Sequence, residues 1–597
     1  MPIIPGYKGG IADSLYEPIS KQTYQTAKNL DVLSGLNILK SLPVSATITQ
    51  PSGDGMSEYK PLGIIKGTDA KYYLLGKATI SSTNTLVLHS SSDLSTWTLV
   101  FRTSAATING AIEEFKDGIF FGHTSSSVAY LRRFGNLAGT DATFTVTIAS
   151  PAVFTATGHG LAAGDSVIFS TTGALPTGLT VGTVYYVISG GLTADAFEVS
   201  TTPGGSAVNT SGSQSGTHSI NYACKIVSSG LTSEMTFLRA HKDFGKLFFI
   251  HDSGKKIGSY TGATQTTVVT LAALTLGTDD VAVGIEPYGN FSMVGIRNTN
   301  GASRFLKWDG SSTTVYDSTL LSDTGLQTFR ISNENIHYIT GNNITGSPNY
   351  KYYIGLNTDP IKEFKLGTVT GSVNCNPYAV DFMNGSFIFG FEVATATLLD
   401  QVIWLYGSGN KNYPKLLTPW RTRLSAVTTD TVFIGLKNFS DRTVVIFRNN
   451  ADDTYVMEQW GNSATTNDDG VYKSNAFALN NGKLDTIKRI LILHSPLAAS
   501  CGFTLKLKHI GHYPVSGSVL SEDSFTAIPG PQGNSSAPGQ AQSTTNATYT
   551  VIEDVALFKE ARFAQIEIDW DEVNSSNSAE IIFPIFIETV NGNVIGI

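Results

Sequence analysis

One short apolar strand pattern occurs seven times in this sequence, and it decides the fold. The copies read YYLLG (72–76), IFFG (119–122), LFFI (247–250), SMVG (292–295), HYITG (337–341), FIFG (387–390) and VFIG (432–435). Their last residues are 46, 128, 45, 46, 49 and 45 positions apart. The long interval contains a segment of different character, Phe144–Ile220, and without these 77 residues it rejoins the series.

Further strand-like runs follow each copy in register, for example NTLVLHSS after the first copy and TVVIF after the last. Units of four strands that recur every ~40–50 residues are typical of a β-propeller. A single small sheet cannot bury both of its faces, whereas seven sheets packed around an axis can, and closing the ring protects their edges. The alternative is an irregular β-sandwich with accidental spacing, and the regular period favours the propeller.

We therefore predict an all-β chain: a seven-bladed propeller with an inserted small β-domain and a C-terminal antiparallel, jelly-roll-like β-sandwich. The predicted boundaries are 1–57 for an N-terminal arm, 58–143 for blades 1 and 2, 144–220 for the insert, 221–467 for the remaining blades and 468–597 for the sandwich. The arm lacks strong periodicity, and Ile19–Leu42 could hold one short helix.

Composition excludes several classes of protein. The chain has 40 Lys and Arg side chains against 48 Asp and Glu, a formal net charge of −8, and no basic tract, so it does not resemble a dedicated nucleic-acid binder. No apolar run reaches the ~18 residues of a membrane span, and no secretory signal is visible. Cys224, Cys375 and Cys501 lie far apart and predict neither a zinc site nor a disulfide framework, which is consistent with folding in a reducing cytosol.

Two turns carry local support for the blades. SSSDLSTWTLVF, from Ser90 to Phe101, resembles the Asp box of sialidase-type propellers, although it is one residue short and lacks the glycine. In that motif the Asp closes the turn between two strands and the Trp packs between blades. Lys307-Trp308-Asp309-Gly310 predicts a similar turn in the fourth unit.

The insert resembles a small β-module of tail-fibre and other virion proteins of tailed bacteriophages. The match covers about Pro151–His218 and rests on Gly158-His159-Gly160-Leu161, Gly164-Asp165 and Pro203-Gly204-Gly205, which occur in that order. The opening Gly9–Ser14 resembles, more weakly, the start of phage structural proteins. A propeller with accessory β-domains is also similar in outline to the tail nozzle proteins of short-tailed phages. The resemblance implies a part of the virion, and it assigns no site residue.

One constellation of ionisable residues emerges when the units are aligned. Nine positions before the end of each copy stand Glu113, His241, Glu286 and Asp381, while the other units have Gly67, Ser332 and Ala426 there. These four side chains are expected at one level near the central channel. Two carboxylates could form a glycosidase acid/base pair or a ring of carboxylates could hold a cation, but we favour a hydrated channel lining.

Two other groupings have simple explanations. His509 and His512 could hold a metal, yet residues three apart on a strand point to opposite faces, so a surface strand end is preferred. Asp569 and Asp571 share a face and could bind Ca²⁺, but few oxygen ligands accompany them. We assign no catalytic, cofactor-binding or metal residue.

The leading hypothesis is a non-enzymatic structural protein of a phage tail: a ring, nozzle-like or fibre-anchoring component made in the host cytoplasm and assembled as a homo-oligomer with other tail proteins. In this role DNA is only passing cargo. The alternatives are an adhesin that recognises host surface glycan and a propeller glycosidase that acts on envelope polysaccharide. The arm carries Tyr7, Leu15, Tyr16, Ile19 and Tyr24 and is interpreted as a strap that orders against a neighbour.

Overall fold

The structure is a computed structural model of the whole chain. It describes residues 46–356 with short gaps, 375–390, 431–460 and 471–596 with gaps of which 529–548 is the longest, and separate strands elsewhere. Every element in this described part is a strand. The described part contains no helix of the length and hydropathy that a membrane crossing requires.

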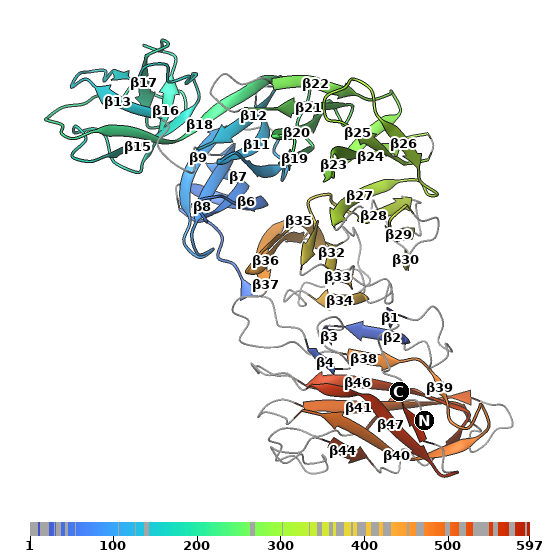
Figure 1. Cartoon of the computed structure of the whole chain (residues 1–597). Coiled ribbons are helices and arrows are strands. Elements are labelled where there is room, and N and C mark those ends of the chain that lie inside the picture. Colours follow the sequence, from blue (N-terminus) through green and yellow to red (C-terminus); the bar gives the residue numbers. More distant parts are fainter. Residues whose placement is uncertain are drawn as a thin grey trace.

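Most of the chain forms consecutive antiparallel four-stranded sheets (Figure 1). Five of them, each given from its first strand outward, are β6–β9 (Met56–Lys66, Tyr72–Ile80, Thr83–Ser91, Thr98–Ser104), β19–β22 (Phe237–His241, Lys246–His251, Lys256–Tyr260, Val269–Thr275), β23–β26 (Asp280–Tyr288, Phe291–Asn298, Arg304–Trp308, Asp317–Leu320), β27–β30 (Leu326–Ser332, Asn335–Asn342, Asn349–Ile354, Lys362–Lys365) and β31–β34 (Val380–Met383, Ser386–Gly390, Val402–Gly407, Leu417–Arg421). Another consists of β10, β11, β12 and β18 (Ile112–Phe115, Gly118–Ser125, Val128–Phe134, His218–Leu231) and continues into the insert.

The remaining sheet joins distant parts of the sequence. It runs β35, β36, β37 (Thr431–Phe439, Arg442–Asn449, Thr454–Trp460) and ends on β5 (Ala46–Thr47), which pairs with β37 through Glu458 and Gln459. The first strands of the sheets contact one another in the order β6, β10, β19, β23, β27, β31, β35 and back to β6. The sheets are therefore arranged around a common axis, as in a propeller (Figure 1).

The last of these sheets corrects one detail of the sequence alignment. VFIG (432–435) lies in the first strand of its sheet, β35, whereas the other six copies lie in second strands. TVVIF belongs to the second strand, β36. Ala426, which the alignment placed in the seventh unit, lies outside the described residues.

Apolar side chains from neighbouring sheets fill the spaces between them. Trp308 of β25 is fully buried and packs against Phe248 of β20, with ring centroids 5.2 Å apart. Asp309 closes the turn that follows, because its Oδ1 accepts the N–H groups of Ser311 and Ser312 at 2.9 and 2.8 Å. These hydrogen bonds stabilise the charged carboxylate and lower its pKa.

The Asp-box-like turn uses the same chemistry. Asp93 Oδ1 accepts N–H groups from Ser95 and Thr96 at 2.8 and 2.9 Å, and these bonds lower the pKa of the carboxyl well below its usual range. Trp97 donates its indole N–H to Thr49 O at 2.7 Å, next to β5. This Trp therefore connects the first sheet to the strand that completes the last one.

The insert folds as a small closed sheet of its own. Its strands are β13 (Ala142–Val146), β14 (Phe154–Thr155), β15 (Ser166–Thr171), β16 (Val184–Ile188) and β17 (Ala196–Ser200). They pair in the order β18-β13-β14-β17-β16-β15, and β15 returns to β18, so the sheet closes. Stacked rings of Phe154, Phe169 and Phe197 lie in its core.

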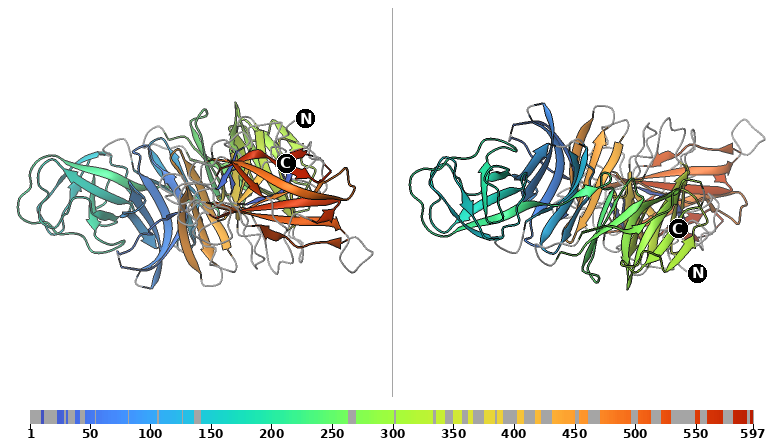
Figure 2. Two further views of the ribbon diagram at one scale, coloured as in Figure 1. Left: turned by 90° about the horizontal axis from the view of Figure 1, so that it is seen from below. Right: turned by 90° about the horizontal axis from the view of Figure 1, so that it is seen from above.

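The long strand β18 belongs to both the insert and the ring. Its first part pairs with β13 and β15, and its second part pairs with β12 from Phe134–Cys224 to Ala129–Leu231. Ile168 and Val184 of the insert also pack in the cluster that holds Tyr73 and Phe134. Two views at right angles to Figure 1 place the insert at one end of the molecule (Figure 2).

Two further sheets contain the C-terminal strands. The first runs β1, β2, β38, β46, β41, β42 (Gly10–Ile11, Thr23–Lys28, Val471–Ser474, Phe563–Asp571, Gly502–His512, Ser521–Glu522), with β39 (Phe477–Ala478) and β43 (Thr526–Ile528) alongside. The second runs β3, β4, β47, β40, β44 (Leu30–Asp31, Ile38–Ser41, Ile581–Thr589, Asp485–His494, Tyr549–Ile552), with β45 (Glu560–Ala561) and β48 (Val594–Gly596) alongside. Tyr472 of the first sheet contacts Phe583 of the second, with ring centroids 5.2 Å apart.

The N-terminal arm differs from the sequence-based expectation. Strands β2, β3 and β4 occupy the region where one short helix was expected, so that prediction was wrong. β2 pairs with β38, and β4 pairs with β47. These pairings give the backbone N–H and C=O groups of the arm the hydrogen-bond partners that they require. Tyr7, Leu15, Tyr16 and Ile19 lie outside the described residues.

Candidate functional site in the central channel

The first strands of six consecutive sheets carry charged residues of alternating sign toward the ring axis. In ring order from β10 to β35 they are Glu113, Arg239, Glu286, Arg330, Asp381 and Lys437. The remaining strand, β6, contributes Ile64. Charges of opposite sign on neighbouring strands attract one another, and ion pairs join Glu113 to Arg239 and join Glu286 to both Arg239 and Arg330.

Glu286 lies at the centre of this network. Its carboxylate receives Arg239 Nε at 2.9 Å and Nη2 at 2.6 Å from one side, and Arg330 Nη1 at 2.9 Å from the other. Arg239 Nη1 also lies 3.8 Å from Glu113 Oε1. The side chain of Glu286 is only 4% exposed, and both of its oxygens are occupied by guanidinium donors.

The two arginines respond differently to this environment. Burial alone would lower the pKa of Arg239, but the carboxylates of Glu286 and Glu113 outweigh burial and raise it. For Arg330, burial prevails over the attraction of Glu286 and lowers the pKa. Arg330 also donates from Nη2 to the carbonyl of Pro377 at 2.7 Å.

Pro377 belongs to a short segment, Cys375–Ala379, that precedes β31 and contacts residues of β19, β27 and β35. Tyr378 stacks on Phe237 with ring centroids 5.9 Å apart, and its hydroxyl donates to Thr236 O. Its carbonyl accepts the N–H of Leu436 at 2.7 Å. Burial raises the pKa of the Tyr378 hydroxyl well above its usual range, so this group remains a neutral donor.

Tyr378 lines two cavities. On one side is a small space of about 50 Å³, lined by Glu113, Arg239, Arg330 and Lys437 among others. On the other side is an open mouth of about 710 Å³, where Arg297 is the one charged side chain in the lining. The mouth lies at the end where the first strands of the sheets begin, as its lining residues Thr236, Val281 and Gln327 show.

Three of the four predicted channel residues lie on first strands as expected, but Glu113 and Glu286 belong to a largely buried ion-pair network and not to a hydrated channel lining. Glu113, Glu286 and Asp381 occupy first strands and face the network, and Asp381 Oδ2 accepts the N–H of Asn438 at 2.8 Å. His241 does not belong to the group. It pairs with Lys246 at the end of β19, stacks on Phe244 at 3.8 Å and has Nε2 3.0 Å from Phe291 O.

Arg239 takes the place predicted for His241, because Arg239 pairs with Phe248 as Glu286 pairs with Met293. The connection between β19 and β20 is longer than the corresponding turn in the next sheet, which shifts the count from the repeat by two residues. Sequence reasoning also missed Arg330 and Lys437. The signal that could have revealed them is a charged residue within the first strand of each of six sheets, read without a fixed offset from the next strand.

In this arrangement, the positive charges of Arg239 and Arg330 neutralise the negative charges of Glu286 and Glu113. A glycosidase acid/base pair needs a carboxyl group that can pass a proton to the substrate, and Glu286 has no oxygen without a guanidinium partner. Among the residues that the structure describes, no group of three or more His, Cys, Asp or Glu side chains is suited to a metal. Gly67 and Ser332 lie just after or at the end of first strands.

The other predicted groupings are scattered among structural contacts. His509 Nδ1 lies 3.7 Å from Asp523 Oδ2, whereas only the backbone of His512 is described. Asp569 pairs with Lys506, which also contacts Glu567 at 3.0 Å, so its carboxylate is part of a cross-strand ion pair. The side chain of Asp571 and all of Cys501 lie outside the described residues. Cys224 and Cys375 are buried and form no disulfide with each other, and Cys375 Sγ donates to Gly390 O at 3.3 Å.

The comparisons with known proteins concern the fold. No family model matches the chain, and no curated protein matches it. Similar solved structures include the WD40 domain of Pan2 from Neurospora crassa, with a TM-score of 0.32 and 9% identity over 71% of this chain and 95% of that chain. The Dos1 propeller has a TM-score of 0.30 and 9% identity over 69% and 97% of the two chains. A NanB sialidase mutant from Streptococcus pneumoniae has a TM-score of 0.29 and 12% identity over 70% of each chain. The chain is all-β and has propeller-like neighbours.

Proposed function

We propose that this chain is a non-enzymatic structural component of a bacteriophage tail, built as a seven-bladed propeller with an inserted β-domain and a C-terminal β-sandwich. The observation that carries the non-enzymatic part is the neutralised channel. Glu286 is held by Arg239 and Arg330, and Tyr378 packs nearby with its hydroxyl on Thr236 O. The buried charges thus connect the blades to one another. The tail assignment is supported by the phage-like insert sequence, Pro151–His218.

In this role the propeller is a rigid body, and partners are other copies of the chain and neighbouring tail proteins. DNA passing through the tail would travel beside the propeller, because Tyr378 and the ion pairs occupy its axis. The lumen of a ring would lie between subunits, which fits a head-to-tail assembly closed by rotation.

The test is mass spectrometry of tailed-phage particles purified from cultures that produce this protein, followed by cryo-electron microscopy of the same particles. We expect density for the propeller, insert and sandwich at a fixed place in the tail. Absence of the chain from purified particles contradicts the proposal. Release of reducing ends from host envelope polysaccharide by the pure protein would support the glycosidase alternative.

A further inference from the structure

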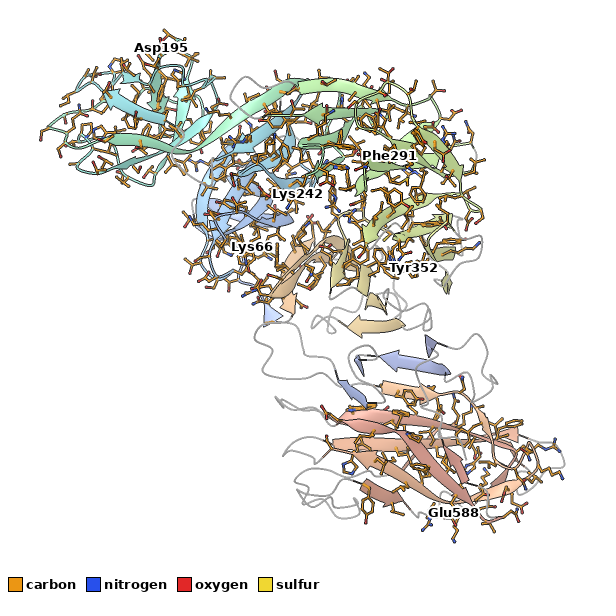
Figure 3. The ribbon with its side chains drawn as sticks, viewed as in Figure 1. Lys66, Asp195, Lys242, Phe291, Tyr352 and Glu588 are labelled. Carbon is orange, nitrogen blue, oxygen red and sulfur yellow. The ribbon has the colours of Figure 1, made fainter. Side chains whose placement is uncertain are left out.

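The insert carries an open groove of about 800 Å³ beside β13 and the start of β18. Its lining comes from three segments, Ala142–Thr145, Thr155–Thr157 and Gln214–His218. The groove is larger than the mouth of the central channel and lies on the part of the molecule that projects from the ring (Figures 1 and 3). Figure 3 marks this projecting part with Asp195, whose carboxylate accepts the N–H of Gly158 at 2.7 Å.

One wall of the groove is fixed by internal hydrogen bonds. His218 is 5% exposed, and its two ring nitrogens contact Thr171 Oγ1 at 2.8 Å and Gln214 Oε1 at 3.0 Å. Gln214 Nε2 in turn donates to Val146 O at 2.7 Å. The segment 214–217 is also braced by Ser215 N–H on Ala174 O at 2.9 Å. A wall held in this way loses little conformational entropy when a ligand binds.

The neighbouring strand β13 and, beyond it, the segment from β14 to Thr157 present hydroxyl groups to solvent. Thr143, Thr145, Thr155 and Thr157 are exposed, and Thr145 and Thr155 are direct partners on adjacent strands. Within the described part of the chain, no hydrogen bond to a protein group is recorded for these four hydroxyls. Each hydroxyl can donate one hydrogen bond and accept two, so this part of the groove offers a closely spaced set of neutral donors and acceptors.

The chemistry of the lining selects the class of ligand. None of the lining residues is Asp, Glu, Lys or Arg, so the groove provides no ion pair for an acidic or basic ligand. Phe144 is buried, and the accessible lining offers no large apolar anchor of the kind that dominates protein–protein interfaces. A neutral ligand rich in hydroxyl groups matches both facts.

We propose that this groove binds a neutral oligosaccharide through the hydroxyls of Thr143, Thr145, Thr155 and Thr157, next to the braced segment Gln214–Thr217. The inference does not depend on the tail role proposed above, since a glycan site could serve any protein exposed to cell surfaces. The tail role and the glycan site are therefore tested separately, because a chain that is present in the tail need not bind glycan.

The experiment measures binding of the full chain to an array of neutral polysaccharides (dextran, mannan and galactan) and acidic ones (polysialic acid and alginate), followed by titration calorimetry. The test variant is Thr145→Val with Thr155→Val, which removes two hydroxyls and keeps the β-branched shape of exposed strand residues. The control on the same insert is Thr201→Val, an exposed residue outside the groove. A second variant, Thr145→Ser with Thr155→Ser, restores both hydroxyls.

We expect neutral polysaccharides to bind, and we expect the double Val variant to weaken binding about tenfold, because two hydrogen bonds of modest net strength are lost. Thr201→Val and the double Ser variant should bind like the original chain. Equal thermal melting of all variants checks that they fold. The proposal is overturned if no neutral polysaccharide binds, if only acidic ones bind, or if the double Val variant binds as well as the control.

Discussion

At the residue scale, the charged groups on the ring axis act as structural connections between sheets. Glu286 bridges an arginine from the preceding strand and another from the following one, and all three are largely removed from water. Buried charges are expensive unless each has its partner, so the network stabilises the ring only while it is complete. The same side chains, read singly in the sequence, resemble candidates for catalysis.

Replacing Glu286 with Gln tests this interpretation. The amide keeps the shape of the side chain but leaves Arg239 and Arg330 without their shared counter-charge. We expect the free energy of unfolding of the ring to fall by about 3–5 kcal/mol in urea titrations. The matched control is Glu588→Gln, labelled at the lower edge of Figure 3, which pairs with Lys488 at 3.3 Å at the surface. That change should have little effect, and equal losses in the two variants would argue against the network.

A second residue-scale prediction concerns buried histidines. Burial lowers the pKa of His89 to about 4, and neither ring nitrogen has a hydrogen-bond partner. In the unfolded chain the histidine pKa is about 6.5, so the unfolded state takes up a proton more readily than the folded state. The free energy of unfolding therefore has its full value above pH 6.5 and falls as the pH decreases towards 4.

His89→Leu should therefore raise the melting temperature at pH 7 and reduce its fall between pH 7 and pH 5. At full extent the pKa shift corresponds to about 3 kcal/mol. Burial also lowers the pKa values of His123 to about 3 and His337 to about 4, so acid sensitivity should shrink without disappearing. The melting temperature is followed by circular dichroism across this pH range. An unchanged pH profile in the variant would show that His89 does not contribute.

At the element scale, the insert is joined to the ring by more than its two chain connections. Arg132 of β12, whose side chain is 4% exposed, lies 3.6 Å from Asp165 of the insert, and its Nε donates to His123 Nε2 at 2.9 Å. Burial raises the pKa of Asp165 to about 6. The Gly164-Asp165 pair, part of the phage-like motif, thus lies at the junction between insert and ring.

Removing Phe144–Ile220 and closing the chain with a short Gly/Ser join keeps the part of β18 that pairs with β12, from Cys224 to Leu231. We expect the ring to unfold in one cooperative transition, but about 5 °C lower, because Ile168 and Val184 no longer cover the cluster around Phe134. Calorimetry of the deletion and of the full-length Ile168→Ala variant gives the comparison. Loss of any cooperative transition in the deletion would mean that the insert is required for the ring to fold.

Local repetition accounts for what the sequence predicted about these elements. Copies such as YYLLG and FIFG mark second strands because each must be apolar on both faces to pack between neighbouring sheets. Where the pairing is non-local, the pattern was insufficient. VFIG was assigned to a second strand because the four strands of its sheet were sought in consecutive order. In the structure VFIG lies in the first strand, and the fourth strand is β5, about four hundred residues earlier in the sequence than its partner β37. Likewise, nothing local in the arm indicates that β2 and β4 find their partners in β38 and β47.

At the scale of the whole molecule, the N-terminal segment contributes to two different bodies. Strands β2 and β4 join the C-terminal sheets, whereas β5 completes a sheet of the ring. This arrangement predicts that a short N-terminal truncation destabilises the C-terminal sheets alone and that a longer one also destabilises the ring. The prediction distinguishes an internal role of the arm from a strap that orders only against a neighbouring protein.

Deletion of residues 2–44 should lower the melting temperature of the C-terminal sheets and leave the ring transition in place, since β5 is retained. Deletion of residues 2–49 should destabilise both, because the outer strand β5 and the Thr49 carbonyl that accepts the Trp97 N–H are also lost. Scanning calorimetry resolves the transitions. If the shorter deletion leaves all transitions unchanged and only abolishes assembly into particles, the arm serves a neighbouring protein instead.

The shared strand β18 also has a mechanical consequence. Its 14 residues extend over about 46 Å and are bonded to the insert strands at one end and to β12 at the other. A pull on the insert along this strand would load the two sets of backbone hydrogen bonds in shear, so that many bonds carry the force together and none must open first. Tension applied at the insert would thus be transmitted into the ring along one continuous hydrogen-bonded strand, and not through a flexible hinge.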